Sequence, residues 1–64
     1  MKLWIARDKD NSLCLHYEKP TLSESGVWYS QQQFMILPKN QYPEVTWENS
    51  PQEIEIELKL INNG

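Results

Sequence analysis

The sequence predicts an all-β fold, a small antiparallel sheet of five or six strands in up-and-down order. Residues 53–60 alternate strictly between charged and apolar side chains, and only an extended strand places the two kinds on opposite faces. Turn-forming residues recur about every eight to twelve positions, a spacing typical of all-β domains. With 64 residues, such a sheet must curl into an open barrel resembling the Src-homology type, or pair with a second chain.

A single small domain is expected over residues 1–61, followed by a frayed tail at 62–64. Cys14 is the only cysteine, so an intramolecular disulfide, the usual staple of small secreted domains, is excluded. The apolar run before Arg7 is too short for a signal peptide or a membrane span. These features predict a cytoplasmic protein.

The first predicted hairpin joins strands at residues 2–7 and 13–17 through a turn at 8–12, where Asp and Asn side chains favour reversal of the chain. Symmetric pairing places Ile5 opposite Leu15 and Leu3 opposite Tyr17 on one face, and Trp4 opposite His16 and Ala6 opposite Cys14 on the other. Both faces of this hairpin are therefore largely apolar, which indicates either central burial or a contact surface.

The middle of the chain is less decisive. Residues 18–26 are expected to form a loop, residues 27–30 a short strand, and residues 34–37 another strand. Ser30 and Gln33 also fit a helix capping box, so a short helix over 30–38 is the alternative. Because Pro38 would end that helix after barely two turns, and helices that short are marginal, the strand is favoured. Residues 38–43 are bounded by prolines and predict one 3₁₀ or helical turn.

The last predicted hairpin pairs a strand at 44–48 with the alternating segment, through a turn at 49–52. This register puts Trp47 opposite Ile54 and Val45 opposite Ile56 on the apolar face. The alternation assigns one row of side chains to the core and one to solvent: Ile54, Ile56, Leu58 and Leu60 inside, and Glu53, Glu55, Glu57 and Lys59 outside.

Three segments together resemble a group of short open reading frames found in gut-dwelling bacteria and in their phages and mobile elements. They are MKLWIARDKD at residues 1–10, EKP at 18–20, and YPEVTWENSP at 42–51 followed by the alternating strand. The resemblance covers most of the chain. The group has no known function, so the resemblance implies a bacterial or phage-type origin and a cytoplasmic location, and it assigns a role to no residue here.

No catalytic, metal or cofactor site is expected. Cys14 and His16 point to the same side of one strand, but a closed zinc site needs four ligands and the chain has no other Cys or His. A nucleophile would further need a cleft and an oxyanion hole, so the protein is not expected to be an enzyme. The segment 8–12 resembles the start of a calcium loop, yet the twelfth position of that loop is Lys19 instead of a bidentate Glu.

The aromatic content predicts a contact surface. Five aromatic residues cannot all enter so small a core: Trp4, Trp28, Tyr29, Tyr42 and Trp47. Exposed aromatics are favoured anchors at protein interfaces. The sequence therefore predicts a non-catalytic interaction module of a bacterial or mobile-element system. It would bind a partner protein, or a second copy of itself, through the aromatic surface formed by Trp4, His16, Trp28 and Tyr29.

An alternative function rests on charge. The formal net charge is −3 and basic residues are not clustered, which argues against direct binding of nucleic-acid phosphates and of anionic membranes. Glu53, Glu55 and Glu57 would instead form an acidic row spaced by about 6.8 Å, close to the spacing of phosphates along a nucleic-acid strand. An acidic nucleic-acid mimic that occupies a DNA-binding protein is the alternative to a row of solvated charges that discourages aggregation.

Overall fold

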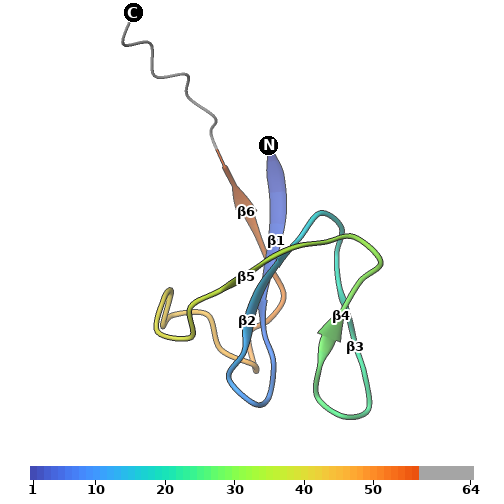
Figure 1. Cartoon of the computed structure of the whole chain (residues 1–64), viewed down its shortest axis with the longest axis vertical. Coiled ribbons are helices and arrows are strands. Elements are labelled where there is room, and N and C mark those ends of the chain that lie inside the picture. The colour runs from blue at the N-terminus through green and yellow to red at the C-terminus, as the bar shows by residue number, and fades with distance from the viewer. Residues whose placement is uncertain (57–64) are drawn as a thin grey trace, which may run out of the picture.

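The computed structural model describes residues 1–56, the side chain of Phe34 excepted, as six strands in two antiparallel sheets (Figure 1). A four-stranded sheet has the order β5-β2-β1-β6, and a two-stranded sheet joins β3 and β4. No helix occurs in this part of the chain. The strands are β1 (Lys2–Arg7), β2 (Leu13–His16), β3 (Thr21–Leu22), β4 (Trp28–Tyr29), β5 (Gln33–Leu37) and β6 (Gln52–Glu55).

The predicted all-β antiparallel class is confirmed, but the single up-and-down sheet is wrong, and the strands do not form a closed barrel. The larger sheet ends at β5 on one side and β6 on the other, and these two edges do not pair in the described residues. The remaining strands, β3 and β4, contain two residues each and pair only with each other. Such short strands cannot bridge the two edges of the sheet, so six strands form two sheets instead of one curled sheet.

The first hairpin follows the predicted register. Trp4 lies opposite His16, and Ala6 lies opposite Cys14. The connecting turn is closed by backbone bonds, in which the Asp8 amide donates to the Ser12 carbonyl at 2.8 Å and the Asn11 amide donates to the Asp8 carbonyl at 2.9 Å. Asn11 adopts a φ of 81°, a left-handed conformation that Asn tolerates better than most residues.

The strand predicted around residues 34–37 is confirmed as β5, and the alternative helix over 30–38 is wrong. β5 pairs with β2, with Leu13 opposite Leu37 and Leu15 opposite Met35. The register shifts by a β-bulge between Leu15 and His16. Tertiary pairing with β2 has outweighed the local capping signal, as expected where a helix would be too short to persist alone.

The predicted hairpin between residues 44–48 and the alternating segment is wrong. Residues 43–50 form no strand and contain turns at 43–44 and 48–49, and β6 pairs instead with β1, placing Ile54 opposite Leu3. Local side-chain bonds explain the difference: the Thr46 amide donates to Asn49 Oδ1 at 2.8 Å, and the Asn49 amide donates to Thr46 Oγ1 at 3.2 Å. Such bonds offer the backbone an alternative to a strand ladder.

The alternation is confirmed as far as the structure describes it. Ile54 and Ile56 are half-buried against the core, and Glu53 and Glu55 are exposed. Lys59, Leu58, Leu60, Glu57 and the predicted tail at 62–64 lie outside the described residues.

No 3₁₀ or helical turn forms at residues 38–43, which corrects the prediction. Two successive reverse turns occur there, with the Gln41 amide donating to the Pro38 carbonyl at 3.1 Å and the Val45 amide donating to the Tyr42 carbonyl at 2.9 Å. Tyr42 has a φ of 51°, and this left-handed residue interrupts any helical run.

The hydrophobic core lies on one face of the four-stranded sheet. Its buried side chains come from β1, β2 and the loop between β5 and β6: Leu3, Ile5, Leu13, Leu15 and Val45. Leu37, Ile54 and Ile56 pack around them. Val45 is 4% exposed although it belongs to no strand, so the loop itself supplies part of the core.

Arg7 holds that loop on the sheet. Its side chain is 6% exposed and bonds only to oxygen atoms of the protein. Nε donates to the Val45 carbonyl, and the two terminal nitrogens donate to the carbonyls of Asn11, Lys39, Gln41 and Tyr42 and to Asn11 Oδ1. No carboxylate forms an ion pair with the guanidinium in residues 1–56. Arg7 therefore replaces the strand pairing that this loop lacks.

Candidate interaction surface

The β3–β4 hairpin lies beside the four-stranded sheet (Figure 1) and is fixed to it by three hydrogen bonds. The Lys9 amide donates to the Gly26 carbonyl at 2.9 Å, and the Trp28 amide donates to Asp8 Oδ1 at 2.8 Å. His16 Nδ1 and Ser30 Oγ are 2.7 Å apart. Two of these bonds reach the β1–β2 turn, so the hairpin is held in one orientation relative to the sheet.

Gly26 lies directly against Lys9 of that turn. It has a φ of 85°, and a Cβ atom built there would lie 2.8 Å from Lys9 Cβ and 3.0 Å from Lys9 Cδ. Glycine adopts such a φ without steric cost, whereas an L-residue pays roughly 1–2 kcal/mol.

Replacing Gly26 with alanine is therefore expected to lower the free energy of unfolding by about 1–3 kcal/mol, from conformational strain and the contact with Lys9. Urea denaturation measures this change. Ser25→Ala is the matched control, because Ser25 is exposed in the same turn, and it should change stability by no more than about 0.5 kcal/mol. Equal effects of the two substitutions would contradict the explanation.

The four residues predicted to form an aromatic surface differ in accessibility. Tyr29 is 54% exposed, Trp4 and Trp28 are half-buried, and His16 is 1% exposed. His16 lies opposite Trp4 in β1, on the sheet face away from the core, with Nδ1 beside Ser30 Oγ. Its ring is therefore enclosed within the protein, and is not available to a partner.

The exposed apolar side chains of the hairpin form what we call the hairpin patch: Leu22 (41% exposed), Val27 (40%) and Tyr29 (54%). Leu22 lies opposite Trp28, and Tyr29 lies opposite Thr21. Because cross-strand neighbours share a face and successive residues alternate, Leu22 and Tyr29 project from opposite faces of the hairpin. The aromatic content identified Tyr29 but not Leu22 or Val27, because neither is aromatic; Leu22 was also expected to lie in a loop at residues 18–26, and Val27 in the strand at 27–30. The Thr-Leu pair before the Ser-Glu-Ser-Gly turn was the only available signal of β3.

Trp4 lies next to a basic side chain and next to the first residue of the acidic row. Lys19 Nζ lies 5.6 Å from the centroid of the Trp4 ring, within the range of a cation–π contact. Glu53 lies opposite Trp4 in the neighbouring strand. Basic, aromatic and acidic side chains thus stand side by side on the sheet face opposite the core.

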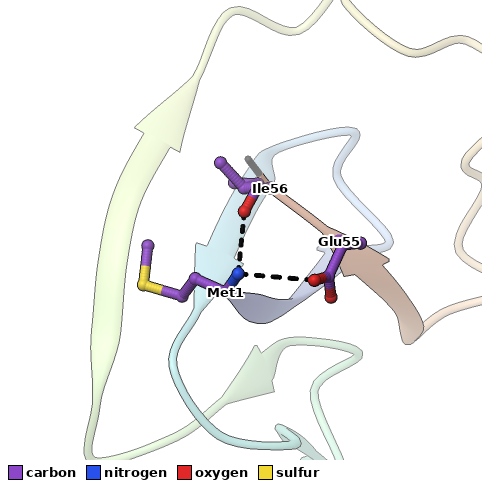
Figure 2. A network of polar contacts seen from close by, with 3 residues as sticks. All are labelled: Met1, Glu55 and Ile56. Atoms are coloured by element: carbon purple, nitrogen blue, oxygen red, sulfur yellow. Dashed lines mark hydrogen bonds and ion pairs between the residues drawn. The ribbon is translucent and has the colours of Figure 1, made fainter. Parts of the chain in front are cut away.

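The acidic row is partly neutralised. The amino group of Met1 is 3.5 Å from Glu55 Oε1 and donates to the Ile56 carbonyl at 2.8 Å (Figure 2). Lys2 lies directly opposite Glu55. Glu57 lies outside the described residues. The described part of the row therefore presents less uncompensated negative charge than the sequence alone suggests.

His16 is a buried titratable group. Burial lowers the pKa of His16 below its usual value, and the negative charge of Asp8 opposes this shift. The folded protein therefore binds the proton less readily than the unfolded chain, whose His has a pKa of about 6.5. The stabilising contribution of neutral His16 is complete above about pH 6.5 and is lost as the pH falls through the lower, folded-state pKa.

We expect the free energy of unfolding to decrease below about pH 6.5, with a slope of at most about 1.4 kcal/mol per pH unit. Because His16 is the only histidine, the ring-proton shifts of one NMR signal report its pKa in the folded state directly. His16→Asn should retain a group able to bond Ser30 and should flatten the pH dependence between pH 5 and 7. An unchanged slope in His16→Asn would assign the titration to other groups.

Cys14 and the carboxylates do not assemble a reactive site in the described part of the chain. Burial raises the pKa of the half-buried Cys14 thiol, and the charges of Asp8 and Asp10 raise it further, so the thiol is less nucleophilic than a free cysteine. Among residues 1–56, no three His, Cys, Asp or Glu side chains come together in a way that could hold a metal ion.

A pocket of about 390 Å³ lies between the β1–β2 turn and the loop after β5. Arg7 forms part of its wall but has its donors committed to the loop, and the Lys9 Nζ lies 5.6 Å from the Trp47 ring centroid. Two of the three cationic residues that line the pocket, Arg7 and Lys9, therefore contact other groups of the protein, and Lys39 is the third.

The chain matches no protein-family model, no curated protein and no solved structure. The resemblance to short bacterial and phage-type reading frames therefore stays a prediction. No helix in residues 1–56 has the length and apolar character needed to cross a membrane.

Proposed function

We propose that the protein is a non-catalytic interaction module that binds a partner protein through the hairpin patch, with Trp4 and Trp28 at its base. The observation that carries the proposal is the exposure of Leu22, Val27 and Tyr29 on one short, anchored hairpin. Burying apolar surface contributes about 25 cal/mol per Å², and aromatic side chains are frequent hot spots.

The anchoring of the hairpin supports this role. Binding is weakened when loops must be ordered as the complex forms. Here the hydrogen bonds that join Asp8 to Trp28, Lys9 to Gly26, and His16 to Ser30 already fix the hairpin in the free protein. A partner would therefore meet a preorganised surface.

Site-specific photocrosslinking tests the proposal. A benzoylphenylalanine placed at Tyr29 should give a discrete adduct in bacterial extract, whereas the same group at Tyr42 should not. Tyr42 is the matched control, because it is 50% exposed but lies in the loop on the core side.

The captured protein is then purified and titrated against the full chain. Tyr29→Ser should raise the dissociation constant by at least about tenfold, equivalent to a loss of about 1.4 kcal/mol in binding free energy. Equal crosslinking at both positions, or an unchanged dissociation constant, would refute the assignment of the surface.

A further inference from the structure

We infer that two copies of the chain associate edge to edge through β5, in antiparallel orientation, so that their four-stranded sheets become continuous. This surface is separate from the hairpin patch, and the inference stands independently of the proposed function.

The outer edge of β5 is open. β5 is the terminal strand in the order β5-β2-β1-β6, and within residues 1–56 its only strand partner is β2. Alternate backbone amide and carbonyl groups of an edge strand point away from the sheet and can pair with another strand. Three residues, Met35 to Leu37, follow the bulge in regular register with β2, so this part of the edge is straight enough to pair.

Charge distinguishes the two edges of the sheet. Residues 30–38 contain no charged side chain, whereas β6 carries Glu53 and Glu55. In a symmetric dimer each strand meets its own copy, so the surface must be complementary to itself. Self-pairing of β6 would bring acidic side chains together, and like charges across a strand pair are destabilising. β5 meets the symmetry requirement without that cost, and natural edge strands that avoid pairing usually carry charges.

The exposed side chains of β5 also favour a second copy of the chain as its partner. Ile36 is 71% exposed, more than any other large apolar residue described, and Met35 is 47% exposed. Because neighbouring residues of a strand point to opposite faces, pairing through this edge would shelter apolar surface on both sides of the sheet. Met35 lies opposite Leu15 of the core, so the same contact would extend the core into the second copy.

The regular part of β5 sets the expected register. Ile36 is the middle residue of the three, Met35 to Leu37, that follow the bulge in regular register with β2, and overlap of these three residues in the two copies places it opposite Ile36 of the second copy. The two Cβ atoms would then be separated by roughly 4.5–5.5 Å. A charge introduced at Ile36 should therefore meet the same charge in the other copy.

Sedimentation velocity and light scattering on the full chain, over a concentration series, test the inference. The wild-type protein should approach a mass of twice 7.6 kDa as concentration rises. Ile36→Lys should raise the dissociation constant of the dimer by at least about tenfold, the factor corresponding to about 1.4 kcal/mol. An equimolar mixture of Ile36→Lys and Ile36→Glu should recover the dimer, because opposite charges then face each other.

Leu22→Lys is the matched control, since Leu22 is an exposed apolar residue of the hairpin patch and its substitution should leave the dimer intact. Circular dichroism checks that each variant is folded; should Ile36→Lys unfold, Met35→Lys and Met35→Glu replace the pair. A wild-type protein that stays monomeric at every concentration would overturn the inference. A dimer that is lost in Leu22→Lys and retained in Ile36→Lys would also overturn it, and would assign self-association to the hairpin patch.

Discussion

Arg7→Met is expected to lower the free energy of unfolding by about 3–5 kcal/mol, the cost of removing one member of a buried charged network. A domain of this size has a total stability of only about 3–5 kcal/mol, so most of the variant should be unfolded at 25 °C. The physical cause is the loss of the guanidinium donors that bond the carbonyls of Asn11, Lys39, Gln41, Tyr42 and Val45. Far-UV circular dichroism and urea denaturation measure the effect.

Two further substitutions separate charge from geometry. Arg7→Lys keeps the positive charge, but an ammonium group has three donors in place of five and no planar fork, so it should recover only a small part of the loss. Lys2→Met is the control on the same strand, at an exposed position, and should change stability by at most about 0.5 kcal/mol. Full recovery in Arg7→Lys would show that charge alone matters.

Leu3→Ala is expected to cost about 2–5 kcal/mol, because the side chain is fully buried and the remaining cavity cannot collapse completely. Leu3 lies in β1 opposite Ile54 of β6, so the substitution removes apolar packing where the two ends of the described chain meet. In a thermal melt the midpoint should fall by roughly 8–40 °C, using about 4–8 °C per kcal/mol for a domain of this size.

Leu22→Ala provides the comparison for Leu3→Ala. The same atoms are removed, but Leu22 is 41% exposed, so less apolar surface is lost from the folded state and no enclosed cavity forms. Its effect should stay below about 1 kcal/mol. If both leucines gave similar changes, the assignment of the core to the β1–β2 face would be incorrect.

The parts of the fold that were predictable from the sequence are those governed by local rules. The β1–β2 register follows from a short turn rich in Asp and Asn, and it placed Trp4 opposite His16 correctly. The alternation of residues 53–56 correctly identified the inner face of β6, because a period of two is specific to strands. Neither argument needs knowledge of distant segments.

The errors came from long-range pairing. Residues 44–48 alternate like a strand, and their nearest apolar partner in the sequence is β6, which favoured a local hairpin. In the structure, the carbonyls of this loop are bonded by Arg7, more than thirty residues away in sequence. A single arginine in a predicted strand carries no sequence signal that it will be buried, so the loop and the β1–β6 pairing could not be deduced.

The candidate surface was predictable only in part. Tyr29 follows from the excess of aromatic residues over what a small core can hold. The burial of His16 depends on long-range contacts, because its ring lies beside Ser30, just after β4. The hairpin that ends there is held by bonds between Lys9 and Gly26 and between Asp8 and Trp28. Those bonds join the β1–β2 turn to the hairpin, and hydrophobic periodicity gives no information about them.

The pairing of β1 with β6 also governs when the protein can acquire its structure during synthesis. β1 is made first, yet one of its two neighbours in the sheet, Gln52–Glu55, is made about fifty residues later. A nascent chain cannot complete its central strand until that segment has left the ribosome. Because contacts between distant segments also slow folding in general, we expect this protein to form its sheet on a scale of milliseconds to seconds, as one cooperative event.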